Sequence, residues 1–214
     1  MHMTNETKIL AGIVVITIAI VIGAVFFLSQ PEKPIVVDAA KLVKEDSLKL
    51  ASESAKLTIV EFGDYQCPAC ALAHPGIKKA VADYPGQVNF VFRHFPLAQH
   101  KNADLASRAV EAANLQGKVW LMHDKLYESQ PEWETEANAL EIFKKYAGEL
   151  GMDVEKFATD ISSDPVKQKV RDDLADGLAI GVNSTPSFYF NSELYKSGVS
   201  YENFKAEIEK YLEK

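Results

Sequence analysis

Cysteine is nearly absent from this chain. Its 214 residues include only two, Cys67 and Cys70. Two cysteines exclude a framework of several disulfides, and a bridge between residues three apart would close a loop too small to stabilise a fold much. The pair therefore needs a chemical explanation, either as reactive thiols or as metal ligands.

Positive charge is also scarce. The chain has 23 Lys and Arg against 30 Asp and Glu, which gives a formal net charge of −7. Nucleic-acid-binding domains carry basic surfaces, so this balance argues against a nucleic-acid partner. Internal repeats and low-complexity tracts are lacking as well, which favours an ordinary globular domain.

Charge of either sign is missing from residues 9–28, a run of twenty residues. A helix of about 20 apolar residues spans the hydrocarbon core of a bilayer. A buried core helix is one alternative. A cleaved signal peptide is another, but its apolar region is usually shorter and ends at a small-residue cleavage site. We predict that residues 1–30 form an uncleaved membrane anchor in the lipid bilayer. Lys8 on its short side weakly favours a cytoplasmic N-terminus.

The remainder predicts a spacer over residues 31–55, part of it a short helix or an ordered tether, and one domain over residues 56–214. The predicted elements of that domain follow in chain order: strand 57–62, a helix from Cys67 interrupted at Pro75 and Gly76, strand 88–92, a helical insertion at about 102–180, strands 187–191 and 193–196, and helix 201–212. A βαβ unit followed by ββα predicts an α/β fold with one mixed sheet and helices on both faces.

The cysteine pair stands at a predicted helix start, in the order Cys67-Pro68-Ala69-Cys70. Proline is well suited to the first helical turn, because its missing N–H costs nothing there. The free backbone N–H groups and the helix dipole favour the thiolate of Cys67 and should lower its pKa. Cys67 is therefore the expected nucleophile, and Cys70, one turn further into the helix, the expected resolving thiol.

Metal binding is the competing interpretation of the same residues. Cys67, Cys70 and His74 form a C-x₂-C-x₃-H pattern. Zinc usually takes a fourth ligand, often from a second Cys/His pair, and the remaining histidines of this chain are scattered singly. We therefore interpret His74 as an exposed helix residue and predict no metal at this site.

Several further residues match one known family. Glu61 lies six residues before Cys67, Pro75 lies eight residues after it, and Thr185-Pro186 precedes the last two strands. With the helical insertion and the stretches 92–97 and 116–124, this order resembles thioredoxin-fold proteins of the DsbA type, in particular membrane-anchored disulfide oxidoreductases of bacteria and archaea. The resemblance covers roughly residues 52–214.

The resemblance implies a thioredoxin-like mixed sheet with a helical insertion, and it implies a role for each matching residue. Pro186 would follow a cis peptide bond and lie beside the cysteines, and the backbone of Thr185 would pair with an extended substrate segment. Glu61 would be buried, have a raised pKa and exchange a proton with Cys70. A carboxylate that reaches the surface or a lysine such as Lys56 is the alternative for Glu61. No organic cofactor is required.

The expected function is that of an extracytoplasmic thiol–disulfide oxidoreductase that introduces disulfides into exported proteins through Cys67 and Cys70. Its partners would be thiol-containing protein substrates and, as the family implies, a quinone-linked membrane protein that reoxidises the pair. The catalytic domain would lie outside the cytosol, where disulfides persist. Two alternatives stay open: a reductase that uses the same pair, and a membrane-tethered module that binds a metal or a peptide.

Overall fold

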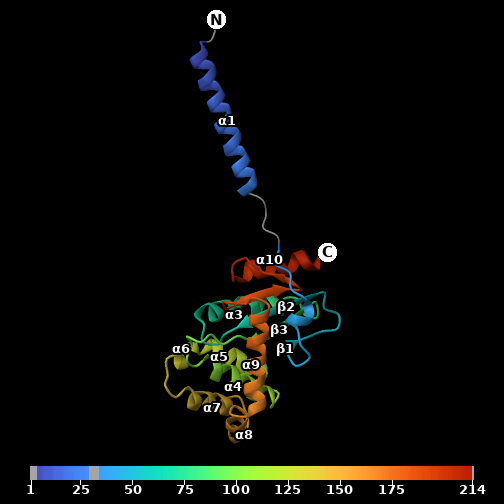
Figure 1. Cartoon of the computed structure of the whole chain (residues 1–214). Helices are drawn as coiled ribbons and strands as arrows, with labels where there is room; N and C mark the ends of the chain where they lie inside the picture. The colour runs from blue at the N-terminus through green and yellow to red at the C-terminus, as the bar shows by residue number, and fades with distance from the viewer. Residues whose placement is uncertain (1–3, 29–33, 214) are drawn as a thin grey trace. The chain divides into compact units, whose positions relative to one another are not determined.

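The computed structural model describes residues 4–28 and 34–213 (Figure 1). The chain divides into two compact units, one ending at Pro34 and the other beginning at Ile35. Residues 1–3 and 29–33, which belong to the predicted anchor and spacer, lie outside the described residues.

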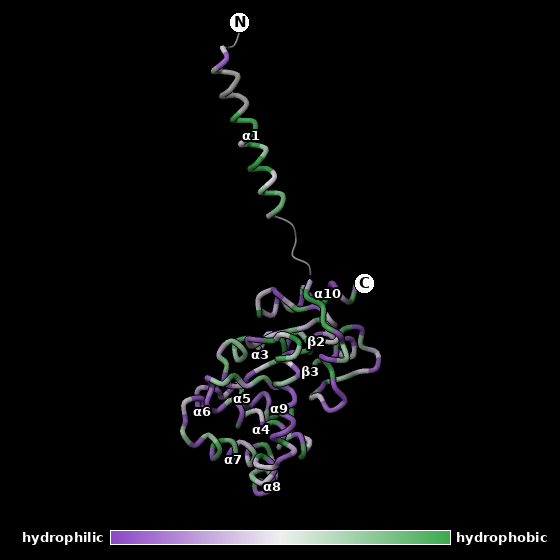
Figure 2. Tube along the Cα trace, in the orientation of Figure 1, coloured by the Kyte–Doolittle hydropathy of each residue, from purple (hydrophilic) through white to green (hydrophobic). Residues whose placement is uncertain are grey.

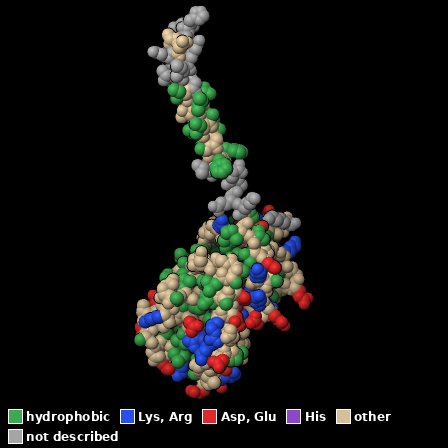
Figure 3. All heavy atoms as spheres, viewed as in Figure 1, with side chains coloured by type: hydrophobic (Ala, Val, Ile, Leu, Met, Phe, Trp, Pro, Cys, Tyr) green, Lys and Arg blue, Asp and Glu red, His purple; other side chains and the backbone are tan. Residues whose placement is uncertain are grey.

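The first unit contains helix α1 (Asn5–Leu28). Its large side chains described between Ile13 and Phe27 are aliphatic or aromatic and exposed. Figure 3 shows hydrophobic side chains along this part of the helix, and Figure 2 shows its hydrophobic residues along the Cα trace. Across the part of the chain that the structure describes, no helix was found with both the length and the apolar character required to cross a membrane. The anchor therefore stays a prediction.

The second unit is built on a five-stranded mixed sheet in the order β1-β3-β2-β4-β5. The bounds of the strands are β1 Leu48–Leu50, β2 Leu57–Gly63, β3 Val88–His94, β4 Ser187–Phe190 and β5 Glu193–Leu194. Strands β2 and β3 are parallel, whereas β1 and β4 run antiparallel to their neighbours β3 and β2. The predicted mixed sheet is confirmed, and its last strand ends two residues earlier than expected.

Helices cover both faces of this sheet, as predicted. Their bounds are α2 Ala39–Leu42, α3 Pro68–Ala82, α4 Ala103–Asn114, α5 Val119–Glu128, α6 Gln130–Trp133, α7 Ala139–Glu149, α8 Val154–Asp160, α9 Asp164–Ala179 and α10 Tyr201–Leu212. Alternate residues of β2 point to opposite faces. Ile59 joins the apolar core that includes Ile77 of α3 and Phe204 of α10, and Val60 joins the core that includes Leu42 of α2 and Leu174 of α9. The insertion between β3 and β4 is helical throughout, as predicted.

Residues 35–55, assigned by the sequence to a spacer, contribute to the second unit. Leu42 is fully buried, and Val36 forms an isolated β-bridge with Glu193. Leu48 to Leu50 add strand β1 to the edge of β3. A strand of three residues is too short to show a period in the sequence, so only its pairing with β3 identifies it.

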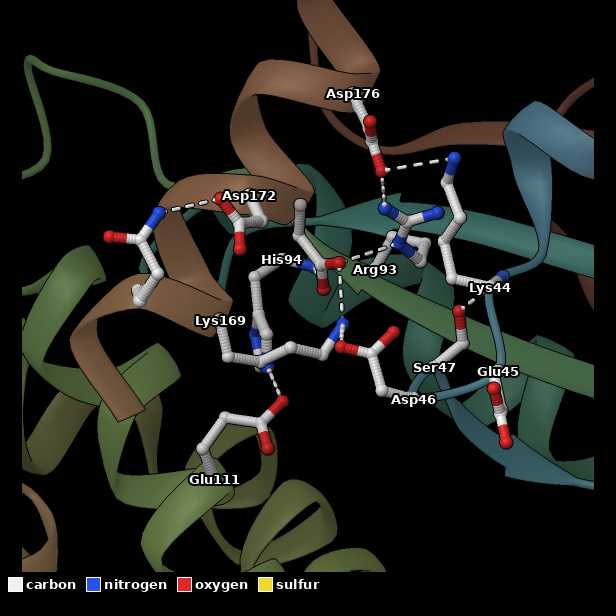
Figure 4. Close-up of polar contacts among 12 residues, drawn as sticks. Lys44, Glu45, Asp46, Ser47, Arg93, His94, Glu111, Lys169, Asp172 and Asp176 are labelled. Carbon is white, nitrogen blue, oxygen red and sulfur yellow. Dashed lines mark hydrogen bonds and ion pairs between the residues drawn. The ribbon is translucent and has the colours of Figure 1, made fainter. Parts of the chain in front are cut away.

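A buried ion network holds this segment against the rest of the domain (Figure 4). The Arg93 guanidinium on β3 donates to the Leu42 carbonyl at 2.9 Å, to Asp173 at 2.7 Å and to Asp176 at 2.6 Å. Lys169 approaches Asp173 at 2.7 Å and Asp46 at 3.4 Å. Arg93 and Asp173 are fully buried, so their contact joins β3 to α9 where water screens it little.

Candidate active site

Strand β2 and helix α3 position the two cysteines. A short loop after β2 ends at Cys67, which has extended backbone geometry and directly precedes the first helical residue, Pro68. Cys67 is 7% exposed and Cys70 is fully buried, and both are free thiols. The predicted helix start is confirmed. The predicted interruption at Pro75 and Gly76 is wrong, because α3 continues through both residues to Ala82. A single proline removes one backbone hydrogen bond, and the packed turns on either side keep the helix continuous.

The two thiols, one helical turn apart, have opposite acidities. A hydrogen bond from the Cys70 thiol is the main cause that lowers the pKa of Cys67 from 9.0 to about 5. Burial opposes this effect, while the Thr185 side chain and backbone N–H groups of the first turn add to it. Burial raises the pKa of Cys70 well above its usual value, and its contacts with Cys67 and the Glu61 charge raise it further. Near neutral pH, Cys67 is therefore a thiolate and Cys70 a thiol.

The loop before β4 closes the site from the opposite side. The Thr185–Pro186 peptide bond is cis, as the resemblance implies. The Thr185 carbonyl accepts a hydrogen bond from the protonated Cys67 thiol at 3.4 Å. The Thr185 hydroxyl is buried without a hydrogen-bond partner among the described residues, so it is available to donate to the thiolate. The sequence pointed to the Thr185 backbone alone, whereas the structure adds its side chain.

Glu61 lies on the face of β2 that packs against α3, and it is only 2% exposed. Burial, followed by the charge of Cys67, raises its pKa from 4.5 to about 8. Its predicted burial is confirmed, and the surface alternative is wrong. Gly63 lies two residues further along the same face, where a Cβ atom would lie 3.0 Å from Oε1 of Glu61 and would collide with the Phe92 ring. Glycine at this position thus leaves room for the carboxyl group.

Gln130, at the start of α6, is a site residue that the sequence did not indicate. Its side-chain amide donates to the carbonyl of Tyr65 at 2.7 Å and to that of Cys67 at 3.2 Å. The helical insertion thereby holds the loop that carries Cys67. No local pattern could have found this contact, because the two residues lie 63 positions apart.

His74 does not behave as the sequence suggested. It is 5% exposed, and its ring stacks on Tyr127 with 4.9 Å between centroids. The prediction of an exposed residue is wrong, because α5 of the insertion covers this side of α3. The ligand atom of His74 groups with those of His123 and Asp124, rather than with the cysteines as the C-x₂-C-x₃-H pattern would require.

Comparison with known proteins places this arrangement in a family. The family model described as "Thioredoxin" matches residues 44–210. The chain is 35% identical over 174 residues to "Na(+)/H(+) antiporter NhaA 1" of Mycolicibacterium vanbaalenii, where the match covers 79% of this chain and 27% of that protein. The chain thus spans about a quarter of the length of that antiporter.

Two further similarities extend over most of both chains. "Probable disulfide bond formation protein D" of Bacillus anthracis is 34% identical over 175 residues, which cover 77% of this chain and 78% of that protein. The crystal structure of oxidised BdbD from Bacillus subtilis superposes with a TM-score of 0.73 at 25% identity, covering 86% of this chain and 100% of that chain. The alpha-DsbA1 structure from Wolbachia pipientis, at 19% identity and a TM-score of 0.72, shares the fold. The chain therefore belongs to the thioredoxin family, and within it the chain is similar to a probable disulfide bond formation protein.

Proposed function

We propose that the chain is a thiol–disulfide oxidoreductase that introduces disulfides into exported proteins through Cys67 and Cys70. The opposite acidities of the two thiols carry this proposal. A thiolate with a pKa of about 5 is a good leaving group. It also stabilises the reduced pair relative to its disulfide, and a stable reduced form makes the disulfide an oxidant.

In the proposed reaction, a substrate thiolate attacks the Cys67 sulfur of the Cys67–Cys70 disulfide. Cys70 leaves as a thiolate and takes a proton, for which Glu61, with its pKa of about 8, is the suitable donor. A second substrate thiolate then attacks the substrate sulfur of the mixed disulfide and releases Cys67 as a thiolate. The substrate loses two electrons and two protons in total. The pair gains the two electrons, one proton replaces the one that Glu61 gave to Cys70, and the other goes to solvent.

Substrate binding and reoxidation complete the proposal. Thr185 and Pro186 are partly exposed beside Cys67, where the backbone of an extended substrate could pair with them. A quinone-linked membrane protein would accept the two electrons from the reduced pair.

We also propose that residues 1–30 anchor the protein as a single membrane span, with the N-terminus in the cytoplasm and the catalytic domain outside. The uncharged run at 9–28 supports the membrane span, and the disulfide chemistry supports its orientation. A reporter that is active only outside the cytosol, fused after Lys214, would be active. An inactive reporter would place the domain in the cytoplasm and contradict the proposed orientation, but it would not contradict the proposed redox reaction.

Trapping of a mixed disulfide is the direct test. Cys70→Ser removes the resolving thiol, so we expect Cys67 to accumulate disulfide-linked substrate proteins that reductant releases. Cys67→Ser, the matched control, should trap none. A Cys70→Ser variant that traps nothing would contradict the oxidoreductase and favour a tethered binding module.

The reduction potential decides the direction of electron flow. We expect equilibration of the pair with glutathione to give a potential nearer to roughly −120 mV, as for DsbA, than to roughly −270 mV, as for thioredoxin. A value near the lower figure would overturn the oxidase and leave a reductase that uses the same cysteines.

A further inference from the structure

A cluster of two histidines and a carboxylate lies between α3 and α5, outside the redox pair. His74 follows Cys70 by one turn of α3, and His123 and Asp124 are neighbours on α5. One ligand atom from each of the three lies within 4.8 Å of the others. Two imidazole nitrogens and a carboxylate oxygen form a donor set that zinc and related divalent ions accept.

His74 has a buried nitrogen that forms no hydrogen bond to the described residues. Its Nε2 atom is 3.2 Å from Oδ1 of Asp124, but the contact lacks hydrogen-bond geometry. No other described residue forms a hydrogen bond to this nitrogen. A buried polar atom without a partner costs free energy, and a metal ion between His74 and Asp124 would satisfy it.

A hydrogen bond to Tyr65 orients the ring of His123. Its Nδ1 atom lies 2.8 Å from the hydroxyl of Tyr65 in a buried hydrogen bond. Metal-binding histidines commonly use one ring nitrogen for the metal while the other is held by a hydrogen bond. Tyr65 occupies Nδ1, so Nε2 is the nitrogen that a metal would use.

The cluster also opens onto a cavity. A space of about 210 Å³ is lined by His74, His123 and Asp124 together with mainly apolar side chains such as Phe90 and Trp120. This cavity gives an ion a route to the cluster and gives a water molecule room to act as a further ligand.

A second cluster among the described residues, His94, Glu111 and Asp173, has one histidine and two carboxylates, and its charge balance also differs. Oδ1 of Asp173 already accepts bonds from Arg93 and Lys169, and Oδ2 accepts one from the His94 backbone. In the α3–α5 cluster, the cation at Asp124 is Lys78, whose ammonium lies 2.8 Å from Oδ2. The Lys78 side chain is 48% exposed, so it can move into solvent when an ion arrives.

We propose that His74, His123 and Asp124 bind a divalent d-block ion such as Zn²⁺, with water from the adjacent cavity as a further ligand. The ion displaces Lys78 from Asp124. No electron or group transfer is involved, and the site does not depend on the direction in which the cysteine pair works.

The test uses the full-length, untagged chain in detergent with Cys67 and Cys70 oxidised, so that thiolates cannot bind the metal. Co²⁺ is titrated and followed by its visible absorption, and Zn²⁺ affinity is then obtained by competition. We expect one ion per chain, an affinity at least 10-fold weaker in His74→Ala and Asp124→Asn, and one roughly 10-fold weaker in Tyr65→Phe.

The most specific test uses Lys78, because the proposal predicts that its ammonium competes with the metal for Asp124. Lys78→Ala removes the competing ammonium and should tighten binding several-fold. The matched control is Lys79→Ala, the adjacent exposed lysine of α3, which pairs with Asp83 instead and should leave the affinity unchanged. Circular dichroism of each variant verifies its fold, and Asp124→Asn, which conserves shape, serves if His74→Ala does not fold. The absence of binding to the oxidised chain, or equal affinities in wild type and Asp124→Asn, would overturn the proposal.

Discussion

Glu61 on β2 and Asp173 on α9 are both carboxyl groups almost without solvent exposure, yet their surroundings differ completely. Asp173 contacts Arg93 and Lys169 at 2.7 Å each. Burial alone would raise its pKa, but the nearby His94, Arg93 and Lys169 lower it below 3.8. For Glu61, burial and the charge of Cys67 raise the pKa to about 8, and no cation among the described residues offsets them.

The comparison separates a structural carboxylate from a reactive one. A buried charge must be paired or must give up its ionisation. Asp173 is paired, so it stays ionised and joins β3 to α9 at any ordinary pH. Glu61 is unpaired, so it holds its proton up to about pH 8 and can exchange it with a neighbouring thiol under working conditions.

The largest expected effect comes from breaking the paired region. Arg93→Met leaves the buried charge of Asp173 with only Lys169 and His94 as neighbours among the groups described above, and removing one partner of a buried pair typically costs about 3–5 kcal/mol. Unfolding by urea should show this loss. The midpoint of Cys67 alkylation against pH should stay near 5, because Arg93 is not among the groups that shift the pKa of Cys67.

Arg171→Met is the matched control, since Arg171 lies exposed on α9, the helix that carries Asp173, and its hydrogen bonds within the described residues go to the Gln168 side chain. Its effect should stay within about 0.5 kcal/mol. Equal losses in the two variants would show that Arg93 contributes no more than a surface residue.

Replacing the unpaired carboxyl group of Glu61 by a neutral one should increase the free energy of unfolding, whereas Arg93→Met decreases it. The folded pKa of Glu61 is raised, so the contribution of this group to the free energy of unfolding is largest below pH 4.5 and falls as the pH rises toward 8. Glu61→Gln removes this loss. We expect the variant to match the wild type near pH 4 and to exceed it by roughly 4 kcal/mol at pH 7.5, which lies three pKa units above 4.5, at about 1.4 kcal/mol per unit. Urea unfolding of the reduced proteins across this range measures the difference.

Although Glu61→Gln should stabilise the fold, it should also slow the reaction of the cysteine pair. Without a proton donor beside Cys70, the rate of mixed-disulfide formation should fall. The dependence of this rate on pH near 8, where Glu61 titrates, should disappear. A stability difference between wild type and Glu61→Gln that stays constant from pH 4 to 8 would mean that Glu61 does not titrate in this range.

The sequence predicted the reactive region far better than the paired one. The strand that carries Glu61, the helix start at Cys67 and the cis bond before Pro186 follow from local composition and from a motif order shared with a family. The pairing of Arg93 with Asp173 joins residues 80 positions apart, and a single arginine in a strand does not identify its partner. Gln130 and the burial of His74 were missed for the same reason, since both depend on how the insertion packs against α3.

The smallest expected effect lies at the solvent edge of the paired region. Lys44 approaches Asp176 at 3.8 Å, and both side chains are more than a third exposed. Exposed pairs contribute about 0–1 kcal/mol, and Asp176 keeps its 2.6 Å bond to Arg93 when Lys44 is removed. Lys44→Ala should therefore lower the free energy of unfolding by no more than about 0.5 kcal/mol, and urea unfolding in high salt should erase the difference. A loss as large as that of Arg93→Met, unaffected by salt, would mean that Lys44 belongs to the buried network, so that three cations rather than two compensate the acids of α9.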